Sequence, residues 1–180
     1  MKIKLGTSIL ALGAFLIISS GILARNSLGN LITGKVHFPK ELVGKVLTMD
    51  DGRRFTVFRD LRVDGWDDDK EESAVFVVRF RFRNLSLAAN RRLSLIPAPF
   101  LMGMEGLREK IWTVNDKTMT FQGIYQWSSQ ELAERYPESF IFGRMTRRAA
   151  PGTVKYEIFP ATEISGYIQS LRDQPHEVLK

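Results

Sequence analysis

The stretch "SAVFVVRFRFRN" (residues 73–84) alternates between phenylalanine and arginine in its second half, which is typical of a β-strand. Successive side chains of a strand point to opposite faces. One face therefore holds Phe76, Val78, Phe80 and Phe82, and the other holds Val75, Val77, Arg79, Arg81 and Arg83. We expect helices to bury the phenylalanine face. The arginine face either meets solvent, forms salt bridges or lines a polar pocket.

The segments that follow this strand predict an α+β fold. Residues 86–102 form a helix with a Ser86 cap, ended by two prolines, and "GLREKIWTVND" (106–116) and "MTFQGIYQW" (119–127) form a hairpin. Residues 128–145 form a helix broken by Pro137, "GTVKYEIFP" (152–160) forms a last strand, and a short helix ends the chain. The order strand, helix, strand, strand, helix, strand predicts a ferredoxin-like βαββαβ antiparallel sheet.

A sheet with helices on one face leaves the other face in need of cover. The large aromatic side chains of the later strands cannot all lie under two short helices, so we expect some of them on the uncovered face. These are Trp112, Tyr125, Trp127 and Tyr156. The sequence therefore predicts that a second subunit covers this face.

The first 25 residues predict a signal peptide or a membrane anchor rather than part of the folded domain. Two lysines precede an uncharged run over residues 5–24, which is about the ~20 residues needed to cross a bilayer. A cleaved signal peptide and a membrane anchor both fit, and the apolar Ile22 and Leu23 favour the anchor. With Lys2 and Lys4 in the cytoplasm, the main domain would lie outside it.

Between the leader and the domain, residues 26–73 predict a linker followed by a β-rich extension. Residues 26–30 have the composition of a linker, and Asp51-Gly52 lies between two alternating runs, which is a strong signal for a β-hairpin. An acidic loop follows, with Asp67, Asp68 and Asp69, but its spacing does not match a calcium loop. Residues 74–180 then form the ferredoxin-like domain.

The composition argues against several classes of function. The net charge is +6, and without Lys2 and Lys4 it is 24 basic against 20 acidic residues, too mild an excess to indicate nucleic-acid binding. The chain has no cysteine, which excludes thiol catalysis and thiolate metal sites. Its two histidines, His37 and His176, are far apart, so we expect no metal site.

The segments "GLREKIWTVNDKTMTFQGIYQWSSQELAERYPES" (106–139) and "TVKYEIFPATEISGYI" (153–168) resemble the YdhR-type mono-oxygenases. That family lies in the dimeric α+β-barrel superfamily, which also holds the antibiotic-biosynthesis mono-oxygenases. The resemblance covers about residues 74–168 and implies a homodimer whose two sheets enclose a cavity. Residues 128–146 lack the helix histidine that binds iron in the haem-degrading relatives, so we expect neither haem nor another cofactor.

The resemblance implies a cofactor-independent mono-oxygenase that acts on a small aromatic or quinol-like molecule. A non-catalytic ligand-binding or protein-interaction module tethered at the membrane surface is the alternative. No catalytic residue is indicated. The candidates for lining the ligand pocket are Arg79, Arg81, Trp112, Tyr125, Trp127 and Tyr156. The arginines are suited to an oxyanion, and the aromatic side chains are suited to stacking on a ring.

Overall fold

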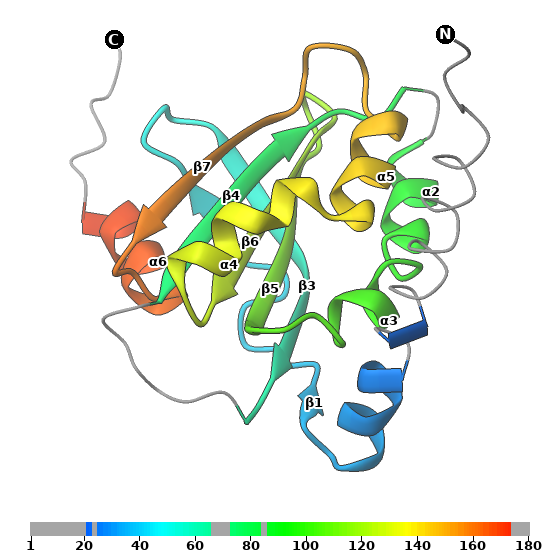
Figure 1. Ribbon diagram of the computed structural model, residues 1–180. Helices are drawn as coiled ribbons and strands as arrows, with labels where there is room; N and C mark the ends of the chain where they lie inside the picture. The colour runs from blue at the N-terminus through cyan, green and yellow to red at the C-terminus, as the bar shows by residue number, and fades with distance from the viewer. Residues whose placement is uncertain (1–20, 23–24, 66–72, 84–85, 174–180) are drawn as a thin grey trace, which may run out of the picture.

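The computed structural model describes residues 21–22, 25–65, 73–83 and 86–173. In this part of the chain seven strands form one sheet, and each pair of neighbouring strands is antiparallel (Figure 1). The order is β1-β3-β5-β6-β4-β7, with β2 also paired to β3. The strands are β1 (Val36–His37), β2 (Val46–Thr48), β3 (Arg54–Val63), β4 (Ala74–Phe80), β5 (Leu107–Asn115), β6 (Thr120–Trp127) and β7 (Lys155–Pro160).

The predicted ferredoxin-like order is confirmed, because β7, β4, β6 and β5 are neighbours in that sequence and helices connect β4 to β5 and β6 to β7. The described helices are α2 (Leu87–Leu93), α3 (Ala98–Leu101), α4 (Gln130–Arg135), the 3₁₀ helix η1 (Tyr136–Glu138), α5 (Phe140–Arg148) and α6 (Ile164–Asp173).

Serine caps mark where helices begin in the two predicted helical segments, and one proline breaks the second segment into shorter helices. Ser86 accepts a hydrogen bond from the Ala89 backbone N–H and begins α2, and Ser129 caps α4 in the same way. Pro137 lies in η1, where the helix breaks, and the Ser139 side chain then caps α5. These caps fix where the helices begin along one face of the sheet.

The core on this helical face contains the predicted phenylalanine face of β4. Phe76 is fully buried and makes edge contacts with the rings of Tyr125, Tyr136 and Phe142, with ring centres 5.2–6.1 Å apart. Trp127 also lies in this core, 5.3 Å from the ring centre of Tyr136. The expectation that helices bury these phenylalanines is therefore confirmed.

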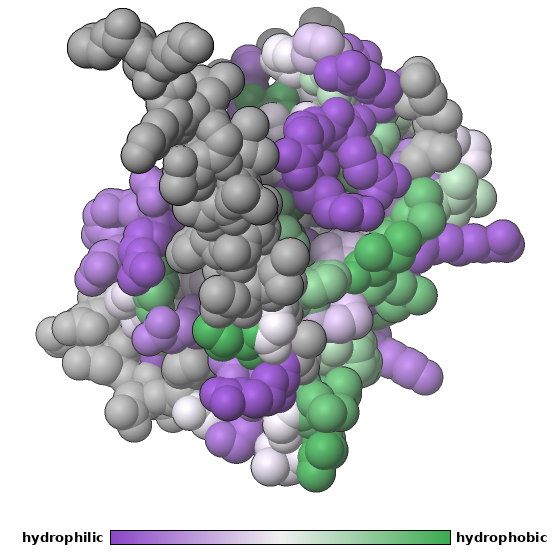
Figure 2. Space-filling model, turned by 45° about the vertical axis from the view of Figure 1, so that its right-hand side comes forward, coloured by the Kyte–Doolittle hydropathy of each residue, from purple (hydrophilic) through white to green (hydrophobic). Residues whose placement is uncertain are grey.

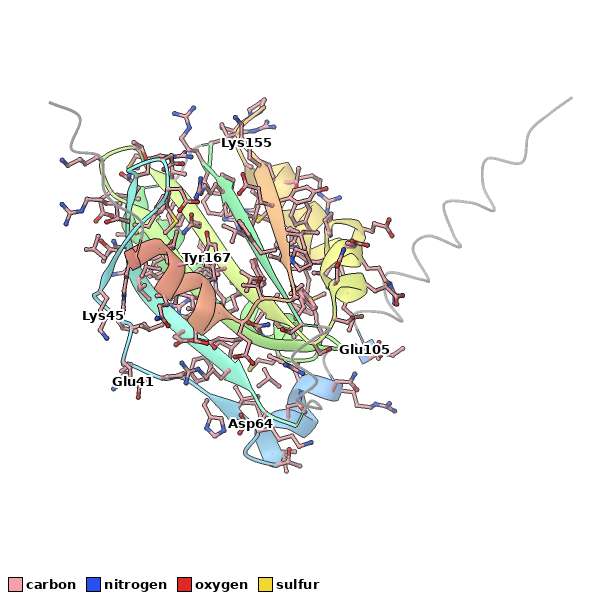
Figure 3. All side chains as sticks on the ribbon, turned by 90° about the vertical axis from the view of Figure 1, so that its left-hand side faces the viewer. Glu41, Lys45, Asp64, Glu105, Lys155 and Tyr167 are labelled. Atoms are coloured by element: carbon pink, nitrogen blue, oxygen red, sulfur yellow. The ribbon has the colours of Figure 1, made fainter. Side chains whose placement is uncertain are left out.

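The opposite face of the sheet is covered by the same chain, which corrects the prediction of an uncovered face. A second core there joins Val75, Val77, Ile111 and Ile124 of the sheet to side chains of the β2–β3 hairpin and of α6. Figure 3 shows α6, with Tyr167 labelled, on the face of the sheet turned away from α4 and α5. Two such sheets cannot meet face to face while these elements remain in place, so a cavity between two sheets is not compatible with this structure. A homodimer of other geometry stays a prediction.

The residues predicted as a linker and extension join the main sheet. The Asp51-Gly52 hairpin is confirmed, because Val46 pairs with Thr56 and Thr48 with Arg54 on either side of it. β3 then pairs with β5 along most of its length and extends the ferredoxin-like sheet at that edge.

The prediction of a linker at residues 26–30 is wrong, because residues 25–32 are helical. The Asn30 side-chain amide donates a 2.8 Å hydrogen bond to the Met102 carbonyl, and the buried Ser27 hydroxyl donates to the Pro99 carbonyl. These tertiary contacts explain why polar residues that are typical of loops form a helix here.

The predicted membrane segment at residues 5–24 lies outside the described residues, apart from 21–22. Among the described helices, none has the length and apolar character to span a bilayer.

Candidate functional site

A cavity of about 490 Å³ lies between the sheet and the helices on the helical face. β4, β5 and β6 form its floor, and α2, α3, η1 and α5 contribute its walls. Cavities of this volume accommodate small organic ligands. The cavity is thus built within one chain, on the face of the sheet opposite to the one predicted.

The floor of the cavity is set by cross-strand pairing of β5 with β6. Lys110 pairs with Tyr125, and Trp112 pairs with Gly123. The glycine allows the tyrosine ring to lie along its own strand, because a Cβ added to Gly123 would be 2.7 Å from Cε2 of Tyr125. A close approach of a ring is the reason for glycine at this position.

Lys110 is the one charged side chain on this floor, and it is 5% exposed. Its Nζ lies 4.3 Å from the ring centre of Trp112 and 4.3 Å from that of Tyr125. Among the described residues, no hydrogen bond or ion pair to the Lys110 Nζ occurs. Burial lowers the pKa of Lys110 well below its ordinary value, and the positive charge of Arg59 lowers it further.

Tyr125 and Tyr136 form a buried pair beside the lysine. The Tyr136 hydroxyl donates a 3.0 Å hydrogen bond to the Tyr125 hydroxyl oxygen. Burial raises the pKa of both tyrosines well above the ordinary value. Both hydroxyls therefore stay protonated at neutral pH and offer hydrogen bonds rather than negative charge.

The charged residues that line the cavity are all basic. They are Lys110 on the floor and Arg144, Arg147 and Arg148 of α5, and no aspartate or glutamate of the described part of the chain lines it. Arg148 lies over the ring of Phe82, with its guanidinium carbon 5.2 Å from the ring centre. Figure 2 turns the side that carries α2, α3 and α5 toward the viewer, and there hydrophilic and hydrophobic residues alternate. The lining therefore favours a ligand with an apolar body and a negative charge.

The structure divides the six residues predicted for the pocket into three groups. Trp112 and Tyr125 line the cavity. Trp127 lies in the core beside Tyr136, outside the lining. Arg79, Arg81 and Tyr156 line a different hollow, where the two arginines lie on the face that α6 covers. The Tyr156 ring stacks on that of Phe76 at the sheet edge, with ring centres 5.1 Å apart.

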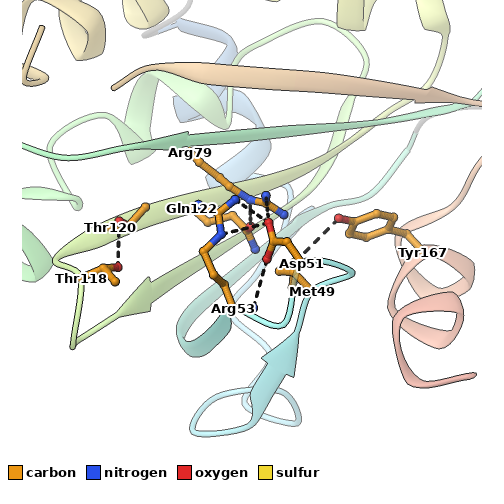
Figure 4. Close-up of polar contacts among 8 residues, drawn as sticks. All are labelled: Met49, Asp51, Arg53, Arg79, Thr118, Thr120, Gln122 and Tyr167. Atoms are coloured by element: carbon orange, nitrogen blue, oxygen red, sulfur yellow. Dashed lines mark hydrogen bonds and ion pairs between the residues drawn. The ribbon is translucent and has the colours of Figure 1, made fainter. Parts of the chain in front are cut away.

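The second hollow is lined by residues of both charges, four basic and two acidic, and two of its arginines pair with one of the acids. Arg79 donates to Gln122 Oε1 at 2.7 Å and pairs with Asp51 at 2.9 Å, while Arg53 contacts the same carboxylate (Figure 4). The hydrogen bond from Arg53 lowers the pKa of Asp51. The salt-bridged interpretation of Arg79 thus fits this geometry better than that of an oxyanion partner.

A buried pair of carboxyl groups lies on the far side of β5 from the cavity. Asp60 is 1% exposed, and Arg62 Nε pairs with Glu109 Oε1 at 3.2 Å. Burial and the nearby Asp60 raise the pKa of Glu109 to about 7, and burial also raises the pKa of Asp60. Among the described residues no group of three or more possible ligands is placed to hold a metal ion, and the acidic loop at residues 66–72 lies outside them.

Sequence reasoning missed Lys110, the most unusual member of the site. A signal was present, because Lys110 and Trp112 are two residues apart on one strand and so share a face. A lysine on the helix-covered face of a strand has to be buried among apolar side chains. Arg144, Arg147 and Arg148 gave no such signal, since basic residues near the end of a helix are common.

Comparison with known families gives one match. The family model described as "Putative mono-oxygenase ydhR" matches residues 78–170, which run from β4 into α6 and include the floor of the cavity and α5. None of the curated proteins compared matches the chain.

Several solved structures are similar to this chain at low identity. A monooxygenase-like protein from Listeria innocua is 13% identical with a TM-score of 0.46, covering 63% of this chain and 67% of its own. A ferredoxin-fold protein from Listeria monocytogenes, related to antibiotic biosynthesis monooxygenases, is 12% identical with a TM-score of 0.47, covering 76% and 88%. A heme-degrading enzyme from the same species is also 12% identical with a TM-score of 0.47, covering 69% and 96%.

Proposed function

Since the chain belongs to the YdhR mono-oxygenase family, we propose that it is a mono-oxygenase that acts on a small quinol-like or phenolic molecule. The substrate would lie in the cavity between β5, β6 and α5. The observation that carries this proposal is a buried amine, that of Lys110, set among the aromatic rings of a cavity of about 490 Å³.

This lining supports the chemistry that such a reaction needs. A quinol reacts with oxygen more readily as its anion, and the site must hold the ring, stabilise the anion and exclude water. Trp112 and Tyr125 offer faces on which a ring can stack, and Lys110 offers an amine that can pair with the oxygen once it is protonated. Among the lining residues that the structure describes, no carboxylate opposes the negative charge.

The proposed reaction balances without another reductant. A quinol and O₂ give a hydroxyquinone and water, so that one oxygen atom enters the ring and the other leaves as water. The quinol supplies all the electrons. The protein would bind the ring, hold its charge and leave oxygen chemistry to the substrate itself.

A panel of quinols and phenols incubated with the full-length chain in detergent under isotopically labelled O₂ tests this proposal. We expect oxygen uptake and a product with one labelled oxygen atom per molecule. W112A should reduce turnover, whereas Y156A, which removes an aromatic side chain outside the lining, should keep it. Oxygen uptake without labelled product, or none with any ring tested, would contradict the proposal.

The alternative function is a non-catalytic binding module, which would hold its ligand in the same cavity without oxidising it. In that case mass spectrometry of the purified chain would find a bound aromatic ligand, and exposure to oxygen would not change the mass of that ligand. The membrane tether and a location outside the cytoplasm stay predictions from residues 1–25, which lie largely outside the described part of the chain.

A further inference from the structure

We propose that Lys110 is the base of this site, taking the hydroxyl proton of a phenolic or quinol ligand and then pairing with the resulting phenolate. In this step the ligand O–H bond breaks, its electron pair stays on oxygen, and the proton forms a new N–H bond on Nζ. The inference rests on the proposed function, because it assigns the ionisable group of the ligand and its partner in the same cavity.

Lys110 is unlike the other described lysines. Lys35, Lys40, Lys45, Lys117 and Lys155 are exposed, whereas Lys110 is buried. A buried ammonium group without a carboxylate is costly, and most proteins avoid it. The position is therefore explained better by a use for the amine than by packing.

Within residues 21–22, 25–65, 73–83 and 86–173, the groups that face the amine contain no acid. β3 contributes Arg59, β6 contributes Tyr125, and η1 contributes Tyr136. α5 contributes its three basic lining residues, and α2 contributes the neutral Asn90. The adjacent Glu109 points away from the cavity and lies with Asp60 and Arg62 on the other face.

Arg59 is held where it acts on the amine. Its guanidinium donates to the Ser94 hydroxyl at 2.5 Å and to the Arg91 carbonyl at 3.4 Å, and it lies 5.7 Å from the ring centre of Trp112. A fixed positive charge and burial both favour the neutral amine in the empty site. A neutral amine can accept a proton, and the ammonium it becomes then gains a phenolate partner.

The ionisation of 4-nitrophenol bound to the full-length protein tests this role without oxygen chemistry. This phenol is colourless when neutral and yellow when ionised, so one spectrum reports the protonation state of the bound ligand. In the wild-type protein we expect binding to lower the pKa of the phenol by about 1–3 units, which is typical of a nearby opposite charge. K110M, which keeps the volume, should lose this shift, and K155M on the exposed β7 edge should keep it.

K110R separates charge from proton transfer. The guanidinium keeps the positive charge, so the bound phenol should still ionise, but it cannot act as a base near neutral pH. Turnover of any quinol oxidised by the wild type should therefore fall in both K110M and K110R, by roughly 10²-fold or more. The wild-type kcat/KM should rise with pH as the amine loses its proton, and this rise should vanish in K110M.

The outcomes distinguish this inference from the proposed function. A phenol pKa that is equal in the wild type and K110M overturns the role of Lys110, even if quinols are oxidised. A shift that depends on Lys110 supports the role, even if no ring is oxidised. Absence of nitrophenol binding to a folded wild-type chain, with a cooperative thermal transition, overturns the inference as well.

Discussion

Lys110 and Tyr125 lie directly opposite each other on β5 and β6, and the lysine nitrogen is 4.3 Å from the centre of the tyrosine ring. The tyrosine hydroxyl bonds to Tyr136 and stays protonated, so the pair holds a neutral ring beside an amine that becomes a cation when it takes a proton. Such an arrangement attracts an anion and places its ring against aromatic side chains. It also has consequences for folding that can be measured without a known substrate.

K110M is expected to stabilise the protein by about 0.5–2 kcal/mol at neutral pH, because it removes a buried, unpaired amine and leaves an apolar side chain of similar size. The pKa of Lys110 is lower in the folded chain than its ordinary value of 10.5. The cost of burying the ammonium is thus full below the folded pKa and shrinks as the pH rises toward 10.5.

K110M should therefore raise the free energy of unfolding more at pH 6 than at pH 10. Urea unfolding at both pH values would measure this difference. K155M, at an exposed position, should change the free energy of unfolding by less than about 0.5 kcal/mol. A destabilised K110M would show that the lysine contributes to packing, and it would weaken the functional interpretation.

Glu109 provides a second test of buried charge, on the other face of the sheet. Its pKa of about 7 lies above the ordinary value of 4.5, so the folded chain binds a proton that the unfolded chain has lost between these values. Stability should fall as the pH rises through this window. E109Q should match the wild type at pH 4.5 and exceed it by about 1–3 kcal/mol at pH 8.

Chemical denaturation across this pH range would measure the effect. E131Q, at an exposed glutamate of α4 paired with Arg135, is the matched control and should show no such trend. If E109Q were less stable than the wild type at pH 8, the ion pair with Arg62 would outweigh the cost of burial.

The order of elements could be predicted from the sequence because each signal is local. Alternation in β4, serine caps at residues 86 and 129, and the Asp51-Gly52 turn all depend on neighbours in the chain. The covering of the second face could not be predicted in the same way. It depends on α6 meeting residues of the β2–β3 hairpin that are more than a hundred positions earlier, such as Met49, whose sulfur accepts a hydrogen bond from Tyr167.

The same distinction applies to the site. Trp112 and Tyr125 were candidates because aromatic side chains on strands are conspicuous. Arg79 was a candidate because an arginine on a strand face is suited to an oxyanion. The β2–β3 hairpin, however, brings Asp51 to it, and the two side chains form an ion pair. Which face of the sheet holds the cavity depended on long-range packing, so the predicted residues were assigned to one pocket although they lie on two faces.

The turn before β5 predicts that substitution by alanine costs more stability at Gly106 than at Gly152. Gly106 and Gly152 both have φ near +70°, which costs about 1–2 kcal/mol for an alanine. A Cβ at Gly106 would also lie 2.3 Å from Cδ1 of Leu132, whereas nothing lies within 4 Å at Gly152. G106A should therefore be less stable than G152A by about 1–3 kcal/mol in thermal or urea unfolding. Equal losses would mean that α4 does not pack against this turn.

Trp112 predicts an optical signal for ligand binding. It lines the cavity, whereas Trp127 is buried outside the lining, so an aromatic ligand should quench mainly the fluorescence of Trp112. W112F should remove most of the ligand-dependent change, and W127F should keep it. W112A should weaken binding about 2–10-fold, as expected for loss of one ring contact. Quenching that survives in W112F would place the ligand elsewhere.

The position of α6 predicts how the second face of the sheet behaves. Ile168 is buried against that face, while its neighbour Gln169 points to solvent. I168A should cost about 2–5 kcal/mol, and Q169A should stay within about 0.5 kcal/mol. Thermal unfolding at several protein concentrations would measure both. Equal effects of the two substitutions, with a midpoint that rises with concentration, would show that a second copy rather than α6 covers the sheet.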